Sequence, residues 1–341
     1  MKVLTVEQMR QADRDAIGKA DGGGMILMSR AGAAVAMAVE TAAALKRTRR
    51  VVLIAGHGNN GGDACVAARC LFEDGFNVQV IMTCVPAVLK GDAREAWDEM
   101  RTAGVPYLVL ASPESWDEDV AVMSGSLLRN GVIVDGVLGT GCQGAPSGAA
   151  ERSIRWINAM RRRALVVAVD LPSGMHGDTG AVQGEAVRAD VTVTFARPKR
   201  CFLNQAEAGR VGHLIVADIG ITDEQCDRST DASPCQIIAL PELAGWLAPR
   251  ARSAHKGEFG HVCVIGGSAG LPHAPVLAAL GALRGGAGLV TLAAPEQSLA
   301  AAAAHVPEAM AQALATQDGA LSDEALGAWR EDFSGFDAVV T

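Results

Sequence analysis

Glycine, amide and carboxyl residues cluster in three short stretches, each of which directly follows an apolar run. These stretches are GHGNNGGD (residues 56–63), VDGVLGTGCQGAPSG (134–148) and VAVDLPSGMHGDTG (167–180). In a parallel sheet, the loops that leave the carboxyl ends of the strands form the ligand-binding edge. We therefore expect the three stretches to build one site.

The first stretch carries the spacing G-x-G-x-x-G, which is typical of dinucleotide binding. Asp63 is expected at the mouth of the helix that follows, where a carboxylate would repel a pyrophosphate. The next apolar run ends in IMTCVP (81–86), without an acidic residue for a ribose. These features argue against hydride transfer with NAD. Two interpretations of this loop remain. In the first, the backbone approaches a ligand closely and the loop recognises its polar groups. In the second, the loop is a tight turn capped locally by Asn and Asp.

The second stretch repeats the glycine spacing at Gly139, Gly141 and Gly144. No acidic residue lies between Gly139 and Gly148, and a helix is expected from near Glu151. Backbone N–H groups without a competing carboxylate can form an anion nest, so we predict phosphate binding in this loop, with a plain glycine turn as the alternative.

The third stretch places Asp170 at the end of a buried run, before the stiff Pro172 and the hydroxyl of Ser173. A partly buried carboxyl in a cleft is a candidate acid or base; its alternative role is to cap the following turn. The side-chain oxygens of Asn60, Asp135 and Ser173 come from the three different loops. Because hard cations prefer oxygen ligands, we predict an alkali or alkaline-earth ion there.

Composition limits the classes of function. The chain has 341 residues, 49% of them hydrophobic, and a formal net charge of −8, which argues against disorder and against nucleic-acid binding.

The start, MKVLTVEQMRQADRDAI, lacks a signal peptide and fits an amphipathic helix, with Thr5 and Gln8 spaced as a capping box. Apolar stretches such as AGAAVAMAV (31–39) are expected to be too short to cross a bilayer. The eight cysteines show no C-x-x-C pair, so we expect a reduced, cytoplasmic protein without a membrane partner.

Continuous apolar runs alternate with helical patterns over the first two thirds of the chain, which predicts strands buried on both faces. The fold class is therefore α/β, with a three-layer αβα, Rossmann-like, mostly parallel sheet. We expect a first domain over residues 1–222 and a polar linker over 223–250. A second, ribokinase-like α/β unit over 251–341 stops inside the apolar run FDAVVT, so we expect it to be incomplete.

Four motifs of the first domain resemble those of the YjeF N-terminal family of NAD(P)H-hydrate epimerases, in the same order. They are AGHGNNGGDACVAARCL, VDGVLGTG, VAVDLPSGMHGDTG and ADVTVTFARPKRCFL. Residues 255–290 (HKGEFGHVCVIGGSAGLPHAPVLAALGALRGGAGLV) resemble the opening of the ADP-dependent NAD(P)H-hydrate dehydratase domain. The resemblance implies a bifunctional metabolite-repair enzyme, an isomerase joined to a lyase, whose small-molecule partner is hydrated NADH or NADPH.

The resemblance also implies roles for single residues. It implies a potassium ion held by Asn60, Asp135 and Ser173. Asp170 would contact the substrate, and we expect it to transfer protons. Lys199 would tune Asp170 or bind a phosphate. The substrate would further be bound by two segments, Asn59, Asn60, Gly61, Gly62 and Asp63, and Gly139, Thr140, Gly141, Cys142, Gln143, Gly144 and Ala145.

The chain departs from the family pattern at Ser29, where relatives carry an acidic residue, and in PKRCFL around Lys199. The motifs that follow in the dehydratase family are missing, so we expect no dehydration by this chain. We expect ADP or ATP to be needed only by a complete dehydratase domain. A non-catalytic nucleotide-binding or scaffold module is the alternative function. Such a module would be free to lose the loops at 59–63 and 170–174, and both are intact. The sequence leaves the oligomeric state open, with a homo-oligomer among the options.

Overall fold

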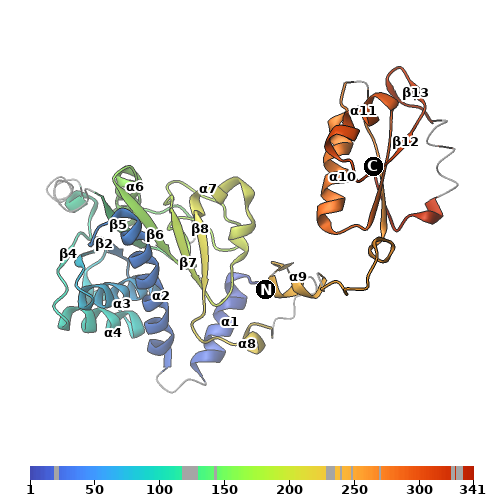
Figure 1. The fold of residues 1–341 in the computed structure, drawn as a ribbon. Coiled ribbons are helices and arrows are strands. Elements are labelled where there is room, and N and C mark those ends of the chain that lie inside the picture. Colours follow the sequence, from blue (N-terminus) through green and yellow to red (C-terminus); the bar gives the residue numbers. More distant parts are fainter. Residues whose placement is uncertain are drawn as a thin grey trace. The chain divides into compact units, whose positions relative to one another are not determined.

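A computed structural model describes residues 1–18, 23–116, 130–141, 144–227, 235–238, 240–246, 249–268, 270–323, 327 and 333–341 of the chain. The chain divides into two compact units, Met1–Leu240 and Pro241–Thr341. Each unit is built around its own parallel sheet (Figure 1).

The first unit contains a seven-stranded sheet in the order β4-β3-β2-β5-β6-β7-β8, in which every neighbouring pair is parallel. This confirms the α/β fold class. The strands are β2 (Arg50–Ala55), β3 (Asn77–Met82), β4 (Tyr107–Val109), β5 (Gly131–Gly136), β6 (Ala164–Val169), β7 (Val191–Phe195) and β8 (His213–Ala217).

Each face of this sheet packs against helices. Along β2, Val51 and Leu53 belong to one hydrophobic core, which is shared with α2, α3 and α4, whereas Val52 and Ile54 belong to a second core shared with α6. Alternate side chains of a strand point to opposite faces, so burial on both faces explains the continuous apolar runs. The helices lie on the two sides of the sheet in Figure 1. Their bounds are α2 (Gly23–Lys46), α3 (Asn59–Glu73), α4 (Gly91–Thr102) and α6 (Gly148–Met160).

Helix α2 corrects one expectation about apolar stretches. It has 24 residues and is long and apolar enough, by length and composition alone, to cross a membrane. Its Leu27, Ala31, Val35 and Val39 are nevertheless buried in the core of the first unit. Burial in a protein core therefore accounts for its apolar character.

The N-terminal segment begins with β1 (Lys2–Val3) and continues into α1 (Val6–Ile17). The expected capping box at the start of α1 is present, because Thr5 and Gln8 each accept a hydrogen bond from the other's backbone N–H. The segment expected as a linker contains α8 (Asp223–Asp227), β9 (Cys235–Gln236) and α9 (Leu240–Trp246). Strand β9 pairs antiparallel with β1, so this part of the expected linker lies in the first unit.

The second unit is also α/β. Its parallel sheet has the order β12-β11-β10-β15, and Val264 and Ile265 of β10 belong to different cores, one on each face. The elements are β10 (His261–Ile265), α10 (His273–Gly285), β11 (Leu289–Ala294), α11 (Glu296–His305), β12 (Met310–Ala313), the hairpin β13 (Thr316–Gln317) with β14 (Ala320–Leu321), and β15 (Ala338–Val340).

Candidate functional site

The three glycine-rich loops follow strands that are neighbours in the sheet. Strand β5 pairs with β2 on one side and with β6 on the other, all in parallel. Their carboxyl ends therefore lie at one edge of the sheet, where the loops meet. The topology thus accounts for how residues 35 to 109 positions apart in the sequence come together.

Asn60, Asp135 and Ser173 form one buried cluster at this edge. The Ser173 hydroxyl donates to Oδ1 of Asp135 at 2.6 Å, and the Ser173 N–H donates to Oδ2 at 2.8 Å. The Asn60 amide donates to the carbonyl oxygen of Val169 at 2.7 Å and to that of Leu138 at 3.3 Å. The structure therefore brings together the three residues that were predicted from the sequence as ion ligands.

The chemistry of this cluster fits an alkali cation. Asp135 is fully buried, and its hydrogen bonds come from neutral hydroxyl and amide donors. Burial raises the pKa of Asp135 to about 6, against the opposing effect of the hydrogen bonds from Ser173. A bound cation would stabilise the ionised carboxylate. Among the described residues, no group of three or more His, Cys, Asp or Glu side chains could hold a metal ion. The oxygens of Asn60, Asp135 and Ser173 are instead of the kind that hard cations prefer.

Gly139 shows why the second loop needs a glycine beside this cluster. A Cβ atom built on Gly139 would lie 2.3 Å from Oδ1 of Asn60. Any side chain at this position would therefore displace the carboxamide that faces the loop.

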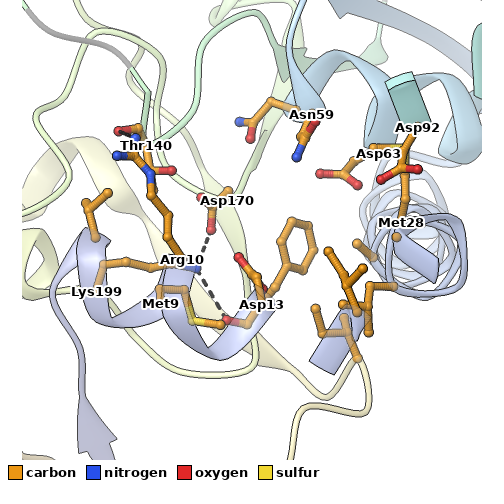
Figure 2. Close-up of a pocket in the computed structure, with 18 residues that line it drawn as sticks. Met9, Arg10, Asp13, Met28, Asn59, Asp63, Asp92, Thr140, Asp170 and Lys199 are labelled. Atoms are coloured by element: carbon orange, nitrogen blue, oxygen red, sulfur yellow. Dashed lines mark hydrogen bonds and ion pairs between the residues drawn. The ribbon is translucent and has the colours of Figure 1, made fainter. Parts of the chain in front are cut away.

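An open cavity lies beside the cluster. Figure 2 shows Asp13, Asp63 and Asp170 pointing into it from α1, from α3 and from the end of β6. The remaining lining residues include apolar side chains of α1 and α2, together with polar ones. They are Val6, Met9, Arg10, Ile17, Gly24, Leu27, Met28, Ala31, Asn59, Asn60, Asp92, Thr140, Phe195, Lys199 and Ile219.

Asp170 and Lys199, the two residues predicted as catalytic, form a buried ion pair in this cavity. The Lys199 ammonium lies 2.5 Å from Oδ1 of Asp170 and also donates to the Thr194 hydroxyl at 2.9 Å. Lys199 is only 2% exposed and Asp170 only 7%. The pair therefore holds one fixed negative and one fixed positive charge out of bulk water.

The backbone of Asp170 is strained. Its φ is +66°, in the left-handed region that favours glycine. Left-handed backbone costs a residue with a β-carbon about 1–2 kcal/mol. Such strain is characteristic of functional sites, where the surrounding structure holds a residue in a required position.

Asp63 does not lie where the sequence placed it. Helix α3 already begins at Asn59, so Asp63 belongs to its second turn and not to its mouth. Its carboxyl is 6% exposed and faces the cavity. Burial, and then the negative charges of Asp170 and Asp13, raise the pKa of Asp63 well above its ordinary value, while Lys199 opposes this shift. Burial therefore favours the protonated form of the Asp63 carboxyl, which can donate a hydrogen bond into the cavity.

We expect the Asp63→Asn variant to be more stable than the native chain at pH 8, with the difference shrinking towards pH 4. The folded state binds a proton at Asp63 that the unfolded chain loses above about pH 4. The native chain thus loses this stability as the pH rises from about 4 through the raised folded-state pKa. Thermal unfolding of both proteins at pH 5 and pH 8 measures the effect. A larger gain at pH 5 than at pH 8 would contradict it.

The second loop contributes to the cavity through Thr140. Cys142 and Gln143, which were predicted to bind substrate, lie outside the described residues. Gly144 has a φ of +81° and lines a separate pocket together with Gly174 and His176. Helix α6 begins at Gly148, three residues before the expected start near Glu151. Phosphate binding by this loop stays a prediction.

Asp13 lines the cavity, but the sequence analysis did not identify it. It lies on α1 four residues after Met9 and three before Ala16, so it shares the inward face of this amphipathic helix. A charged residue on an apolar helix face was the available signal. Burial is the largest cause that raises the pKa of Asp13 to about 6.

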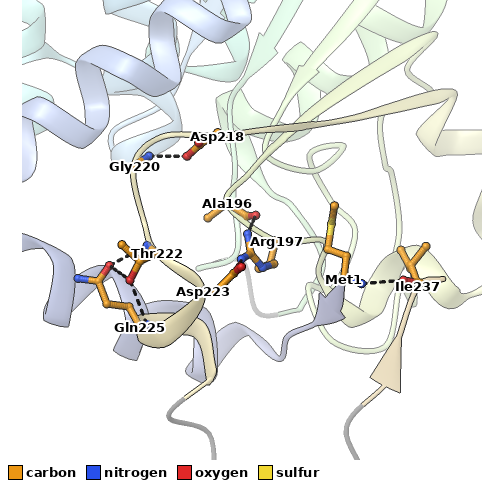
Figure 3. Close-up of polar contacts among 9 residues, drawn as sticks. All are labelled: Met1, Ala196, Arg197, Asp218, Gly220, Thr222, Asp223, Gln225 and Ile237. Atoms are coloured by element: carbon orange, nitrogen blue, oxygen red, sulfur yellow. Dashed lines mark hydrogen bonds and ion pairs between the residues drawn. The ribbon is translucent and has the colours of Figure 1, made fainter. Parts of the chain in front are cut away.

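The segment after β8 lines the cavity through Ile219. The Arg30 guanidinium on α2 donates to the Ile219 carbonyl oxygen at 3.1 Å. Figure 3 shows the turn that follows and the ion pair between Arg197 and Asp223 of α8. These contacts hold the segment against the end of β7 and against α2.

Two family descriptions match the chain. Residues 24–201 match the YjeF-related protein N-terminus, and residues 262–335 match NAD(P)H-hydrate dehydratase. The second match shows that a dehydratase-family domain is present in the chain. It gives no support to the expectation that this domain is incomplete.

Curated relatives carry both parts. The chain is 37% identical over 331 residues to the bifunctional NAD(P)H-hydrate repair enzyme of Moorella thermoacetica, covering 96% of this chain and 60% of the relative. It is 34% identical over 345 residues to the enzyme of that name from Salinibacter ruber, covering 99% of this chain and 63% of the relative. The chain thus spans about 60% of the length of these relatives.

The yeast protein ynu0, of known crystal structure, shares the fold. It aligns with a TM-score of 0.50 and 24% sequence identity, over 61% of this chain and 86% of the yeast chain. The YjeF N-terminal match alone covers more than half of the chain, including Asn60, Asp135, Asp170 and Lys199. The chain therefore belongs to the YjeF-related protein family.

Proposed function

We propose that the first unit is an NAD(P)H-hydrate epimerase, which interconverts the R and S epimers of hydrated NADH and NADPH. The relatives' shared name, a bifunctional NAD(P)H-hydrate repair enzyme, supports the substrate class. The observation that carries the proposal is the cavity in which the Asp170–Lys199 ion pair lies beside the Asn60, Asp135 and Ser173 cluster.

The substrate's reacting carbon carries a hydroxyl group and is bonded to the ring nitrogen. Epimerisation must break and remake a bond at this carbon, through ring opening or through loss of the hydroxyl, and both routes need a positioned acid or base. Asp170 is proposed to exchange protons with the substrate. Lys199 is proposed to orient the Asp170 carboxylate through their 2.5 Å contact.

A potassium ion is the proposed cofactor of the first unit. Asn60, Asp135 and Ser173 would hold it, and the cluster supplies carboxamide, carboxylate and hydroxyl oxygens for this purpose. When bound, the ion supplies a fixed positive charge next to the loop at 139–145, which is proposed to hold the nucleotide phosphates.

The Asp135→Asn variant is expected to bind potassium about 10–100-fold more weakly, because interactions with a charged group contribute ~1.5–3 kcal/mol. The KM for substrate should rise with this loss. Epimerase assays across a potassium titration, with sodium as the control ion, measure both effects. Native activity that is equal in potassium and sodium would speak against the ion site.

The proposed activity is tested by incubating the protein with the R epimer of hydrated NADH and following the S epimer by chromatography. A parallel assay uses hydrated NADPH. We expect conversion well above the rate of a sample without protein. Binding of the hydrate without any conversion would favour the non-catalytic nucleotide-binding module instead.

The second unit is proposed to take part in the dehydration of the S hydrate, with ADP or ATP as cosubstrate. Its match to the NAD(P)H-hydrate dehydratase family supports this assignment. A cytoplasmic location stays a prediction. The possible homo-oligomer stays a prediction.

A further inference from the structure

Asp13 is the one cavity carboxyl that the N-terminal helix contributes. It is half-buried and faces the same space as Asp63 and Asp170 (Figure 2). Within the described part of the chain, its carboxyl makes no hydrogen bond or ion pair, unlike that of Asp170. It also lies before residue 24, where the YjeF N-terminal match begins.

The fold fixes helix α1 relative to the Asp170–Lys199 pair. Leu4, two residues before the helix, donates to the carbonyl oxygen of Pro198 at 3.0 Å and accepts from the N–H of Arg200 at 3.0 Å. These bonds clamp the chain on both sides of Lys199. At the first turn of α1, the Val6 N–H donates to Oδ1 of Asp178 at 2.7 Å. The N-terminal end of α1, about two turns before Asp13, is thus held from two directions.

Among the described residues, Asp13 forms no ion pair with the charges around it. On its own helix, Arg10 lines the cavity, and Arg14 lowers the pKa of Asp13 by less than burial raises it. From other elements, Lys199 lowers the pKa and Asp170 raises it. Asp63 and Asp92 add carboxyls from α3 and α4 to the same cavity. Because burial is the largest effect, the pKa of Asp13 rises to about 6.

Epimerisation through loss of the hydroxyl needs two proton-transfer groups, since the hydroxyl leaves one face of the ring and water adds to the other. Asp170 is held beside a lysine, whereas Asp13 is not. Resting on the epimerase function proposed above, we propose that Asp13 is the second proton-transfer group and donates to the departing hydroxyl, while Asp170 accepts from the incoming water.

The proposed steps balance in atoms and charge. The carbon–oxygen bond breaks, its electron pair stays on oxygen, and the proton of Asp13 converts the hydroxyl into water. The ring nitrogen's lone pair forms a C=N bond, which leaves an iminium cation beside ionised Asp13 and Asp170. Water then adds to the other face, the C=N electrons return to nitrogen, and Asp170 takes the proton. After product release, solvent returns a proton to Asp13 and takes the proton from Asp170, which restores the starting state. The opposite direction reverses each step.

The test is the pH profile of kcat/KM in native protein and in Asp13→Asn. In its active form, the protein holds one proton between Asp13 and Asp170. This proton is lost as the pH rises, so native kcat/KM should fall above a pH near 6. The equilibrium constant of the reaction fixes the ratio of kcat/KM for the two directions. The R-to-S and S-to-R reactions should therefore both show this descending limb of the pH profile. The Asp13→Asn variant should lose about 10²–10⁴-fold in kcat, lose the limb, and change KM by less than about threefold.

Two further variants sharpen the test. Asp15→Asn makes the same change on the same helix at a residue outside the cavity lining, and it should keep native activity and pH dependence. Asp13→Glu retains a carboxyl and should keep a limb, at reduced rate. Circular dichroism and thermal unfolding establish that each variant is folded.

The outcomes separate this proposal from the epimerase assignment. An active native protein with an Asp13→Asn variant that keeps the limb, at whatever rate, overturns the role of Asp13 alone, as does a variant changed only in KM. A folded native protein without epimerase activity overturns both.

Discussion

The Asp170→Asn variant is expected to lose about 10²–10⁴-fold in epimerase kcat at every pH. Asparagine keeps the size of the side chain, and its Oδ1 can still accept from Lys199 and Thr194, whose contacts with Asp170 are 2.5 and 3.1 Å. It cannot take up a proton from water. The change therefore removes proton transfer while preserving the shape of the cavity.

Chromatography of the R and S epimers between pH 5 and pH 9 provides the measurement. Thermal unfolding serves as the control for folding. A variant with near-native rates across this range would show that Asp170 only positions the substrate.

The Lys199→Met variant is expected to destabilise the first unit by about 3–5 kcal/mol, because it leaves the buried Asp170 carboxylate without its cation. Methionine has a similar length, so little cavity space is created. Lys199 also donates to the Phe195 carbonyl oxygen at 3.3 Å, and that bond is lost as well.

Denaturant unfolding of the native protein, Lys199→Met, Asp170→Asn and the double variant yields the coupling between the two residues. The double variant has no uncompensated charge and should be more stable than Lys199→Met. Equal stability of these two proteins, or a loss below about 1 kcal/mol in Lys199→Met, would mean that the pair does not stabilise the fold.

The sheet could be predicted because burial on both faces leaves a strong mark in the sequence. Runs such as RVVLIA (50–55) and GVIVDG (131–136) are apolar at successive positions, and both are strands between two helical layers. Parallel strands end at the same edge of a sheet, so the expected parallel order already predicted that Asn60, Asp135 and Ser173 lie close together. Ion binding by these residues is a separate prediction.

Other features depend on contacts that a local pattern does not encode. The pairing of β1 with β9 joins segments of two residues each, which are too short to give a periodicity. Lys199 was found only through resemblance, because Asp170 and Lys199 are 29 residues apart and follow different strands, β6 and β7. Asp13 was missed because a carboxyl on a short amphipathic helix is usually solvated, and only the tertiary fold places it in a cavity.

The left-handed backbone at Asp170 bears on attempts to engineer this protein. Glycine suits a φ of +66° without steric cost, so a substitution to glycine would relieve local strain there. The buried Lys199 ammonium would then lose its anion, and this costs more than the strain relieved. Laboratory evolution that selects for heat resistance alone would therefore favour loss of the carboxylate only together with replacement of Lys199. Libraries screened for thermostability should keep position 170 fixed, or every round of selection should include a functional assay.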